Sequence, residues 1–246
     1  YFGVILVMLL YNLFLFFSVG DRSYLEYSLF ILMIGGTQLV LNGYTSYLQI
    51  QSLPWLNLRI THFFGVFSGL TTIVFVQNFL RLSRYVPWLH KLLNFYFVIY
   101  LIAFVLAIFG QLIWSYNVIN FCAAAIFFCI PGSIITMRKG YAPAKYFLLA
   151  FTIFIIAVLV FVLKDSGIIP YNAWTFFALP LGSAIEMVVL SLALASRINQ
   201  LKKESAIARE EQMRSLQLNE RLVREQNNVL EDRVKSRTAD LEEMNS

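Results

Sequence analysis

The chain has 246 residues, of which 59% are hydrophobic and only 13% are charged, and its formal net charge is +5. A soluble domain carries about 25% charged residues, so this composition excludes a soluble protein and predicts an integral membrane protein. Residues 197–246 carry as many acidic as basic side chains. Because a surface that binds nucleic acid needs an excess of cations, we expect membrane lipid, and no nucleic acid, as a partner.

Apolar stretches long enough to cross a membrane recur along the first four fifths of the chain. A spanning helix needs about 20 mostly apolar residues. The stretches that meet this requirement are 1–19, 25–43, 57–80, 92–111, 117–137, 145–163 and 173–196, with a polar turn expected at 111–117. No basic segment precedes the first stretch, so we interpret it as a span and not as a signal peptide. The sequence therefore predicts an all-α fold, a seven-transmembrane helix bundle.

The basic residues of the connections predict the orientation of the bundle, because Lys and Arg gather on the cytoplasmic side. If Tyr1 lies outside, the outer connections hold Arg59 and Lys164. The inner side then holds Arg22, Arg81, Arg84, Lys91, Arg138, Lys139, Lys145, Arg197, Lys202 and Lys203. We therefore expect a multi-pass protein of the plasma membrane with its N-terminus outside and its C-terminus in the cytoplasm.

The seventh span runs directly into a charged segment. Gly182 is the only glycine between Ala173 and Ser246, so we expect one helix to leave the membrane and continue into water. This expectation divides the chain into a transmembrane sensor domain, residues 1–196, and a cytoplasmic signalling linker, residues 197–246.

A heptad pattern in the linker predicts a coiled coil. Taking Met213 as an a position places Met213, Glu220, Asn227, Val234 and Leu241 at a, and Leu216, Val223, Leu230, Arg237 and Met244 at d. A buried Asn at an a position fixes the register of a parallel pair, so we expect a homodimer. The apolar residues before Glu211 fit a register offset by one residue, which implies a slip there. The alternative is a single solvated helix, which Glu220 and Arg237 on the seam favour.

Three ionisable residues lie within the spans. Placing a charge at membrane depth costs at least about 2.5–3.5 kcal/mol of free energy on insertion scales, so each of them needs a structural or functional reason. Glu186 lies near the middle of the seventh span, and Arg59 and His62 lie at the outer end of the third. One interpretation is a shared intramembrane site in which Glu186 pairs with His62 or with a ligand. Alternatively, Arg59 extends to the headgroups and His62 hydrogen-bonds between helices. For Glu186, function and structural pairing both stay open.

The other polar and small residues of the spans indicate helix packing. Gly65 and Gly69 form a small-xxx-small face, and the amides Asn12, Gln38, Asn42, Gln77 and Asn78 suit hydrogen bonds between helices. Cys122 and Cys129 are seven residues apart in one apolar run, where packing is the expected role. No residues show metal-ligand spacing, so we expect no metal, no cofactor and no catalytic group.

The first third of the chain contains the short motifs Tyr11-Asn12, Asp21-Arg22-Ser23-Tyr24 with Tyr27, Asn42-Gly43 and Phe79-Leu80-Arg81. Together these motifs resemble the bacterial seven-transmembrane receptors with diverse intracellular signalling modules. The resemblance covers about residues 1–200. It implies an inner-membrane receptor with an outer ligand-binding domain before the first span and an output domain after the seventh. Residues 230–245 are similar to the linkers that precede histidine-kinase, PAS or diguanylate-cyclase modules.

Together these features predict the sensor region of a bacterial signal-transduction protein. A shift of the seventh helix, caused by an extracellular or periplasmic ligand or by the state of the membrane, would pass through the coiled coil to an output domain. A histidine kinase of a two-component system is favoured, and a diguanylate cyclase is next. The alternative is a transporter or channel subunit, although no internal repeat or pair of interrupted spans supports it. A retinal photoreceptor is disfavoured because residues 173–196 contain no Lys.

Overall fold

The structure is a computed structural model that describes residues 1–44 and 53–245, with the side chains of residues 229, 231, 232 and 235–245 left out. It divides into two compact units, Tyr1–Arg197 and Ile198–Ser246. All regular structure in the described ranges is helical, which confirms the all-α prediction.

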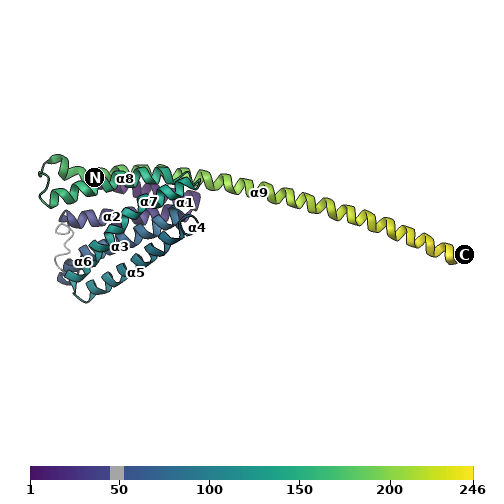
Figure 1. Cartoon of the computed structure of the whole chain (residues 1–246), viewed down its shortest axis with the longest axis horizontal. Coiled ribbons are helices and arrows are strands. Elements are labelled where there is room, and N and C mark those ends of the chain that lie inside the picture. The colour runs from purple at the N-terminus through teal and green to yellow at the C-terminus, as the bar shows by residue number, and fades with distance from the viewer. Residues whose placement is uncertain (45–52, 246) are drawn as a thin grey trace. The chain divides into compact units, whose positions relative to one another are not determined.

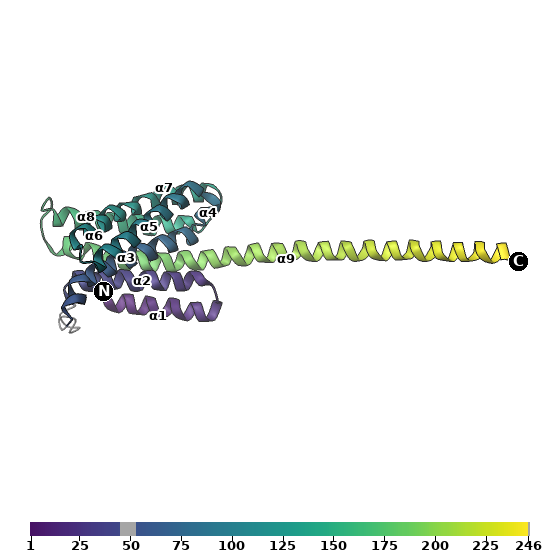
Figure 2. The same ribbon diagram turned by 90° about the horizontal axis from the view of Figure 1, so that it is seen from below.

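The first unit is a bundle of helices that are long and apolar enough to cross a membrane, and the described residues contain seven such spans, as predicted (Figure 1). The bundle consists of α1 (Phe2–Val19), α2 (Arg22–Leu41), α3 (Pro54–Phe79), α4 (Leu82–Tyr85), α5 (Pro87–Ile108), α6 (Leu112–Ala123), η3 (Ala124–Phe128), α7 (Cys129–Arg138), α8 (Ala144–Asp165) and the first part of α9 (Ala173–Asn245). Helix α1 packs on α2, α2 on α3, α3 on α5 and α6, and α7 on α8. Figure 2 shows α1 and α2 as neighbours along one side of the bundle.

Prolines and glycines set the ends of several spans. Helices α3 and α5 begin at Pro54 and Pro87, a few residues before the predicted starts, because the fixed φ of proline suits the first helical position. Gly110 has φ 80° and reverses the chain so tightly that α6 begins at Leu112. The polar turn predicted at 111–117 was therefore wrong, and most of those residues belong to α6.

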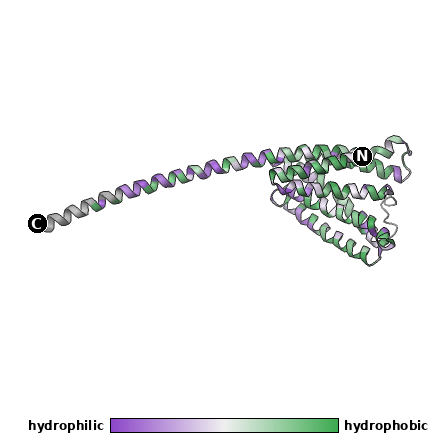
Figure 3. Cartoon of the chain, turned by 180° about the vertical axis from the view of Figure 1, so that it is seen from behind, coloured by the Kyte–Doolittle hydropathy of each residue, from purple (hydrophilic) through white to green (hydrophobic). Residues whose placement is uncertain are grey.

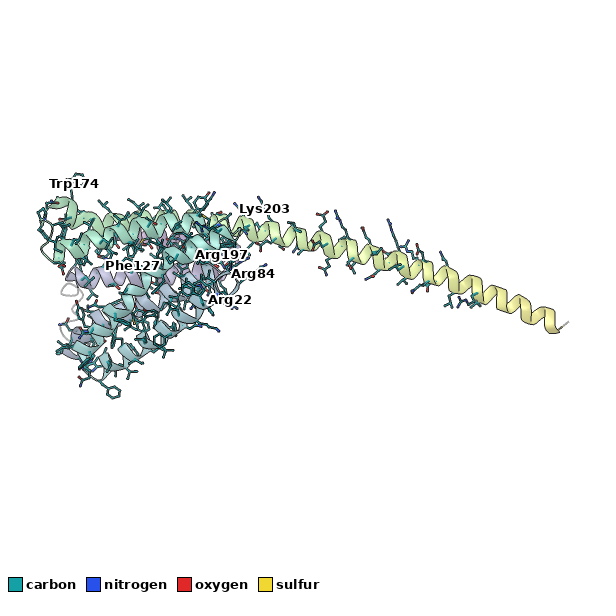
Figure 4. The ribbon with its side chains drawn as sticks, viewed as in Figure 1. Arg22, Arg84, Phe127, Trp174, Arg197 and Lys203 are labelled. Carbon is teal, nitrogen blue, oxygen red and sulfur yellow. The ribbon has the colours of Figure 1, made fainter. Side chains whose placement is uncertain are left out.

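The fifth span is not one uniform helix, as the prediction over 117–137 implied. It changes to a 3-10 helix at η3 and returns to α-helix at Cys129. Pro131 has no N–H to donate to the carbonyl of Phe127, four residues earlier, which accounts for a break at this point. Phe127 lies about midway between the two ends of the bundle (Figure 4).

Aromatic rings and glycines make the close contacts of the bundle. A group of fully buried rings joins α2, α3 and α8, and its tightest pair is Phe147 and Phe151, whose centroids are 4.2 Å apart. A Cβ added at Gly69 would lie 2.2 Å from the Tyr100 ring, and one added at Gly182 would lie 2.2 Å from Cβ of Ala157. Gly69 therefore lets α3 and α5 approach closely, and Gly182 does the same for α8 and α9.

Helix α9 begins with a reciprocal cap. The N–H of Thr175 donates to Oδ1 of Asn172, and the N–H of Asn172 donates to Oγ1 of Thr175, both at 3.0 Å. Pro180 then lies inside α9, a residue that the expectation of a continuous helix did not take into account. It removes one donor to the carbonyl of Phe176, yet the helix continues to Asn245.

The second unit is the remainder of α9, and its described side chains are largely hydrophilic with apolar residues interspersed (Figure 3). Of the predicted seam residues, Met213, Leu216, Val223, Leu230 and Val234 are more than half exposed, and Asn227 is exposed as well. Glu220 pairs with Arg224 at 2.5 Å within the helix. The side chains of Arg237, Leu241 and Met244 lie outside the described residues.

Candidate functional site

Arg59, at the start of α3, is held by backbone carbonyls. Its Nε donates to the carbonyl of Ala107 at 2.9 Å, and its Nη1 donates to the carbonyl of Trp55 at 3.0 Å. The guanidinium carbon also lies 4.8 Å from the centre of the Trp55 ring. Arg59 therefore ties α3 to the last turn of α5, where the carbonyl of Ala107 also accepts from the N–H of Gly110 at 3.2 Å.

His62 makes a similar connection one turn further along α3. Its Nε2 lies 3.1 Å from the carbonyl oxygen of Leu112, so the ring is a donor at this nitrogen. The carbonyl belongs to the first residue of α6. Arg59 and His62 thus join the consecutive helices α3, α5 and α6 at one end of the bundle.

Glu186 lies in α9 and has a very different environment. Its side chain is 0% exposed, and neither carboxyl oxygen has a hydrogen-bond partner within the described part of the chain. No hydrogen bond or ion pair there joins it to Arg59 or His62. The structure therefore does not bring the three predicted site residues together.

Glu186 belongs instead to a line of polar groups where α9 meets α1 and α2, which we call the polar seam: Asn12, Tyr27, Ser183, Glu186 and Ser191. All of these side chains are buried except that of Ser191, which is partly exposed. The hydroxyl of Tyr27 donates to the carbonyl of Met187 at 2.6 Å. Nδ2 of Asn12 donates to Oγ of Ser191 at 3.3 Å. At the other end of the seam, Oγ of Ser183 donates to the Tyr1 hydroxyl at 3.0 Å. These bonds hold α9 to α1 and α2 on both sides of Glu186.

The groups nearest to Glu186 do not neutralise it. Tyr1, Tyr27 and Cys129 interact electrostatically with its carboxyl, and none of these three side chains carries a positive charge. Oδ1 of Asn12 is also buried without a donor in the described residues. A buried polar group without a partner costs roughly 1–3 kcal/mol, so the seam is a place where the bundle keeps an unfavourable arrangement.

Sequence reasoning found part of this seam. It singled out Glu186 by its depth, and Asn12 as a hydrogen-bonding amide. It missed the roles of Tyr27, Ser183 and Ser191, because hydroxyl side chains are common in spans and the partners of these three are distant in sequence. One signal was available, since Ser183 and Glu186 are three residues apart and share a helix face.

A second contact lies where α9 passes the last residues of α3, and we call it the exit contact: Glu26, Asn78, Phe79 and Arg197. Nδ2 of Asn78 donates to Oε1 of Glu26 at 2.8 Å. The guanidinium carbon of Arg197 lies 5.6 Å from the centre of the Phe79 ring, and its charge interacts with Glu26. Arg197, Arg84 and Arg22 gather at one end of the bundle, and Trp174 lies at the opposite end (Figure 4).

The described residues contain no group of three or more His, Cys, Asp or Glu side chains that could hold a metal ion. Cys122 and Cys129 are buried free thiols. The geometry therefore defines a seven-span membrane bundle whose distinctive chemistry is a buried acid on its last helix.

Comparison with known proteins places this bundle in a family. The family model described as "7TM diverse intracellular signalling" matches residues 1–197, and the chain belongs to this family. No curated protein and no solved structure matches the chain. Family membership assigns the protein to a class of seven-span membrane proteins that act in signalling.

Proposed function

We propose that this chain is the membrane sensor and relay region of a signal-transduction protein. The observation that carries the proposal is that α9 is the one element found in both units: it contributes Glu186 to the polar seam and continues to Asn245. A change of packing around Glu186 would thus act on the helix that leads to the output domain. The C-terminus is assigned to the cytoplasm, because Arg22, Arg84 and Arg197 share one end of the bundle.

The proposed mechanism is a two-state shift of α9. In the arrangement described here, the hydroxyl of Tyr27 and the amide of Asn12 hold α9 against α1 and α2, and Phe79 receives Arg197. A stimulus that favours another packing moves or rotates α9. The stimulus arrives from an extracellular or periplasmic ligand or from the membrane. The favoured candidate for the output domain is a histidine kinase, and the second candidate is a diguanylate cyclase.

The linker acts as a parallel homodimer in this proposal. Met213, Leu216, Val223 and Leu230 are 53–60% exposed on the single helix, and they recur with heptad spacing. Apolar residues at this spacing are buried when two helices pair, so a second copy of the chain is the natural occupant of this face.

The relay is tested by breaking α9 in the full-length protein. Insertion of Gly-Pro after Ser205 should uncouple the two units, because proline removes a helical hydrogen bond and costs about 3 kcal/mol or more. The measurement is the output activity of membranes that contain the protein with or without Glu186→Gln, each with and without the insertion. A control insertion of one helix-forming heptad at the same place keeps the seam in phase. If the Gly-Pro variant still transmits the effect of Glu186→Gln, the unbroken-helix mechanism is wrong.

The homodimer is tested by oxidative crosslinking in a background with Cys122→Ala and Cys129→Ala. Val223→Cys lies on the predicted seam and should give a covalent dimer in membranes. Gln226→Cys is exposed on the same helix but off the seam, and it should crosslink at least about tenfold more slowly. Equal rates at the two positions would favour the single solvated helix.

A transporter is the second candidate, since the fifth span is interrupted at η3. Transporters of the inverted-repeat type pair such an interruption with an equivalent one in a second repeat, and among the described spans only this one changes to 3-10 helix. Uptake of small ions and metabolites by proteoliposomes decides between the two functions. If the wild-type protein takes up a solute and Glu186→Gln abolishes this uptake, the protein is a transporter and not a sensor.

A further inference from the structure

Glu186 is the only carboxyl among the described residues of the bundle that is fully buried with both oxygens unpartnered. Glu26, on α2, is half-buried and accepts a hydrogen bond from Asn78, and Asp165, the last residue of α8, is exposed. Moving an isolated carboxylate into a low-dielectric interior is so costly that such a group becomes neutral or takes a counter-ion. The site around Glu186 therefore calls for a positively charged ligand.

The side chains around Glu186 favour a proton over a metal cation as this ligand. Metal cations such as Ca²⁺ and Mg²⁺ take about six or more oxygen ligands, preferably carboxylates and carbonyls. The groups in electrostatic contact with Glu186 are two phenols, Tyr1 and Tyr27, and the thiol of Cys129. Helix α8 contributes Ala157 against Gly182 of α9, and α3 contributes Phe79 against Arg197. None of these residues is a good ligand for a hard cation such as Ca²⁺ or Mg²⁺. For a softer metal, the described residues offer no group of three or more His, Cys, Asp or Glu side chains. Of the residues named, only Arg197 is itself a cation.

We propose that Glu186 is a proton-binding site whose occupancy is linked to the packing of α9 on α1 and α2. With the proton bound, the carboxyl is neutral and the packed arrangement held by Tyr27 and Asn12 is stable. When the proton leaves, the carboxylate has no partner within the bundle, and α9 moves to an arrangement in which water reaches it. The packed state is thus favoured at low pH and lost as the pH rises. That the proton is the stimulus of a sensor is a further step, which rests on the proposed function.

Arg197 is the nearest cation with a defined place on α9, eleven residues beyond Glu186. At 1.5 Å per residue the two positions are about 16 Å apart along the helix, so Arg197 cannot neutralise Glu186 in the packed state. The link between proton and packing therefore does not depend on an ion pair within α9.

The test uses the full 246-residue chain in lipid vesicles and two signals recorded against pH. The first is the infrared band of a protonated carboxyl. The second is the distance between spin labels at Val98→Cys on α5 and Leu192→Cys on α9, both exposed, with the buried thiols of Cys122 and Cys129 left in place. The band should vanish and the distance should change over the same pH interval. Glu186→Gln should lack the band and the distance change, whereas Asp165→Asn, at an exposed carboxyl, should keep both.

Three other results would each overturn the proposal. A wild-type protein without the band throughout the pH range in which it stays packed would show an ionised Glu186. A distance change that follows replacement of sodium by a large organic cation at fixed pH would show a metal site. If Glu186→Gln does not fold, Glu186→Asp keeps a titratable group, and an unshifted transition in that variant would exclude residue 186. Proton binding to this chain, together with an output activity of the full-length protein that ignores pH, would retain the site and overturn the sensor function instead.

Discussion

The two ionisable regions of the bundle differ in how their polar atoms are satisfied. Arg59 and His62 on α3 hydrogen-bond to the carbonyls of Ala107 and Leu112, near the ends of neighbouring helices. Glu186 on α9 is fully buried and has no such partner in the part of the chain that the structure describes. Both regions cost free energy to place in a membrane, yet only the first recovers it through hydrogen bonds.

This difference separates a structural role from a functional one. A backbone carbonyl oxygen has two lone pairs and can accept a second hydrogen bond besides a backbone one, so a basic side chain that donates to it stabilises the fold. An acid without a donor destabilises the fold, and such strain is kept where a site must change state. The following variants sharpen or break the comparison.

The largest expected effect on stability concerns the packing of α3, the helix that carries Arg59 and His62, against α5. Gly69→Ala should lower the free energy of unfolding by about 2–3 kcal/mol, the upper part of the range for overpacking, because its Cβ would lie 2.2 Å from the Tyr100 ring. Gly65→Ala is the matched control, since its Cβ would meet Ile119 at an ordinary 3.5 Å. Reversible unfolding in mixed detergent micelles measures both variants. Equal losses would mean that α3 and α5 are not packed as described.

The next two variants test the comparison between Glu186 and His62 directly, because they should change the free energy of unfolding in opposite directions. Glu186→Leu should raise the free energy of unfolding by about 1–2 kcal/mol, because it removes buried polar atoms that lack partners. His62→Leu should lower it by about 0.6–1.7 kcal/mol, since the carbonyl of Leu112 loses a donor. The same unfolding measurement applies. A loss of stability in both variants would show that Glu186 has an unrecognised partner.

The smallest effect tests a single hydrogen bond of the polar seam. Tyr27→Phe should cost about 0.6 kcal/mol, the average for hydrogen bonds between membrane helices, by removing the donor to Met187. Tyr11→Phe is the control, because the Tyr11 side chain is half exposed. Hydrogen exchange at the α9 amides should increase only in Tyr27→Phe. Increased exchange in both variants would point to general loosening of α1.

Composition and hydropathy were enough to predict the seven spans and the all-α fold, since both depend on residues adjacent in the chain. Helix ends were less well predicted: Pro54 and Pro87 extended α3 and α5 backwards, and Gly110 shortened the turn before α6. The 3-10 interruption at η3 also escaped prediction. Pro131 was visible, but whether a proline bends, breaks or leaves a membrane helix depends on what packs around it.

The candidate site was predictable only residue by residue. Depth in an apolar run identified Glu186, but the pairing with His62 proposed from the sequence does not occur among the described contacts. The partners of α9 come from α1 and α2, at separations of 160 residues for Tyr27 and 179 for Asn12. A single sequence holds no information on such distant contacts, because many arrangements of seven helices satisfy the same hydropathy pattern.

Helix α1 buries only Ile5 and Asn12, which bears on how the protein is made. During translation α1 enters the lipid before the other described spans, and its almost wholly apolar surface needs no protein neighbour there. Helix α9 arrives last among the spans with Glu186, and it reaches a protein environment only if α1, α2 and α7 already stand in place. Until then Asn12 and Tyr27 lack their α9 partners, so an unfinished bundle would present polar groups that quality-control proteases of the membrane can recognise.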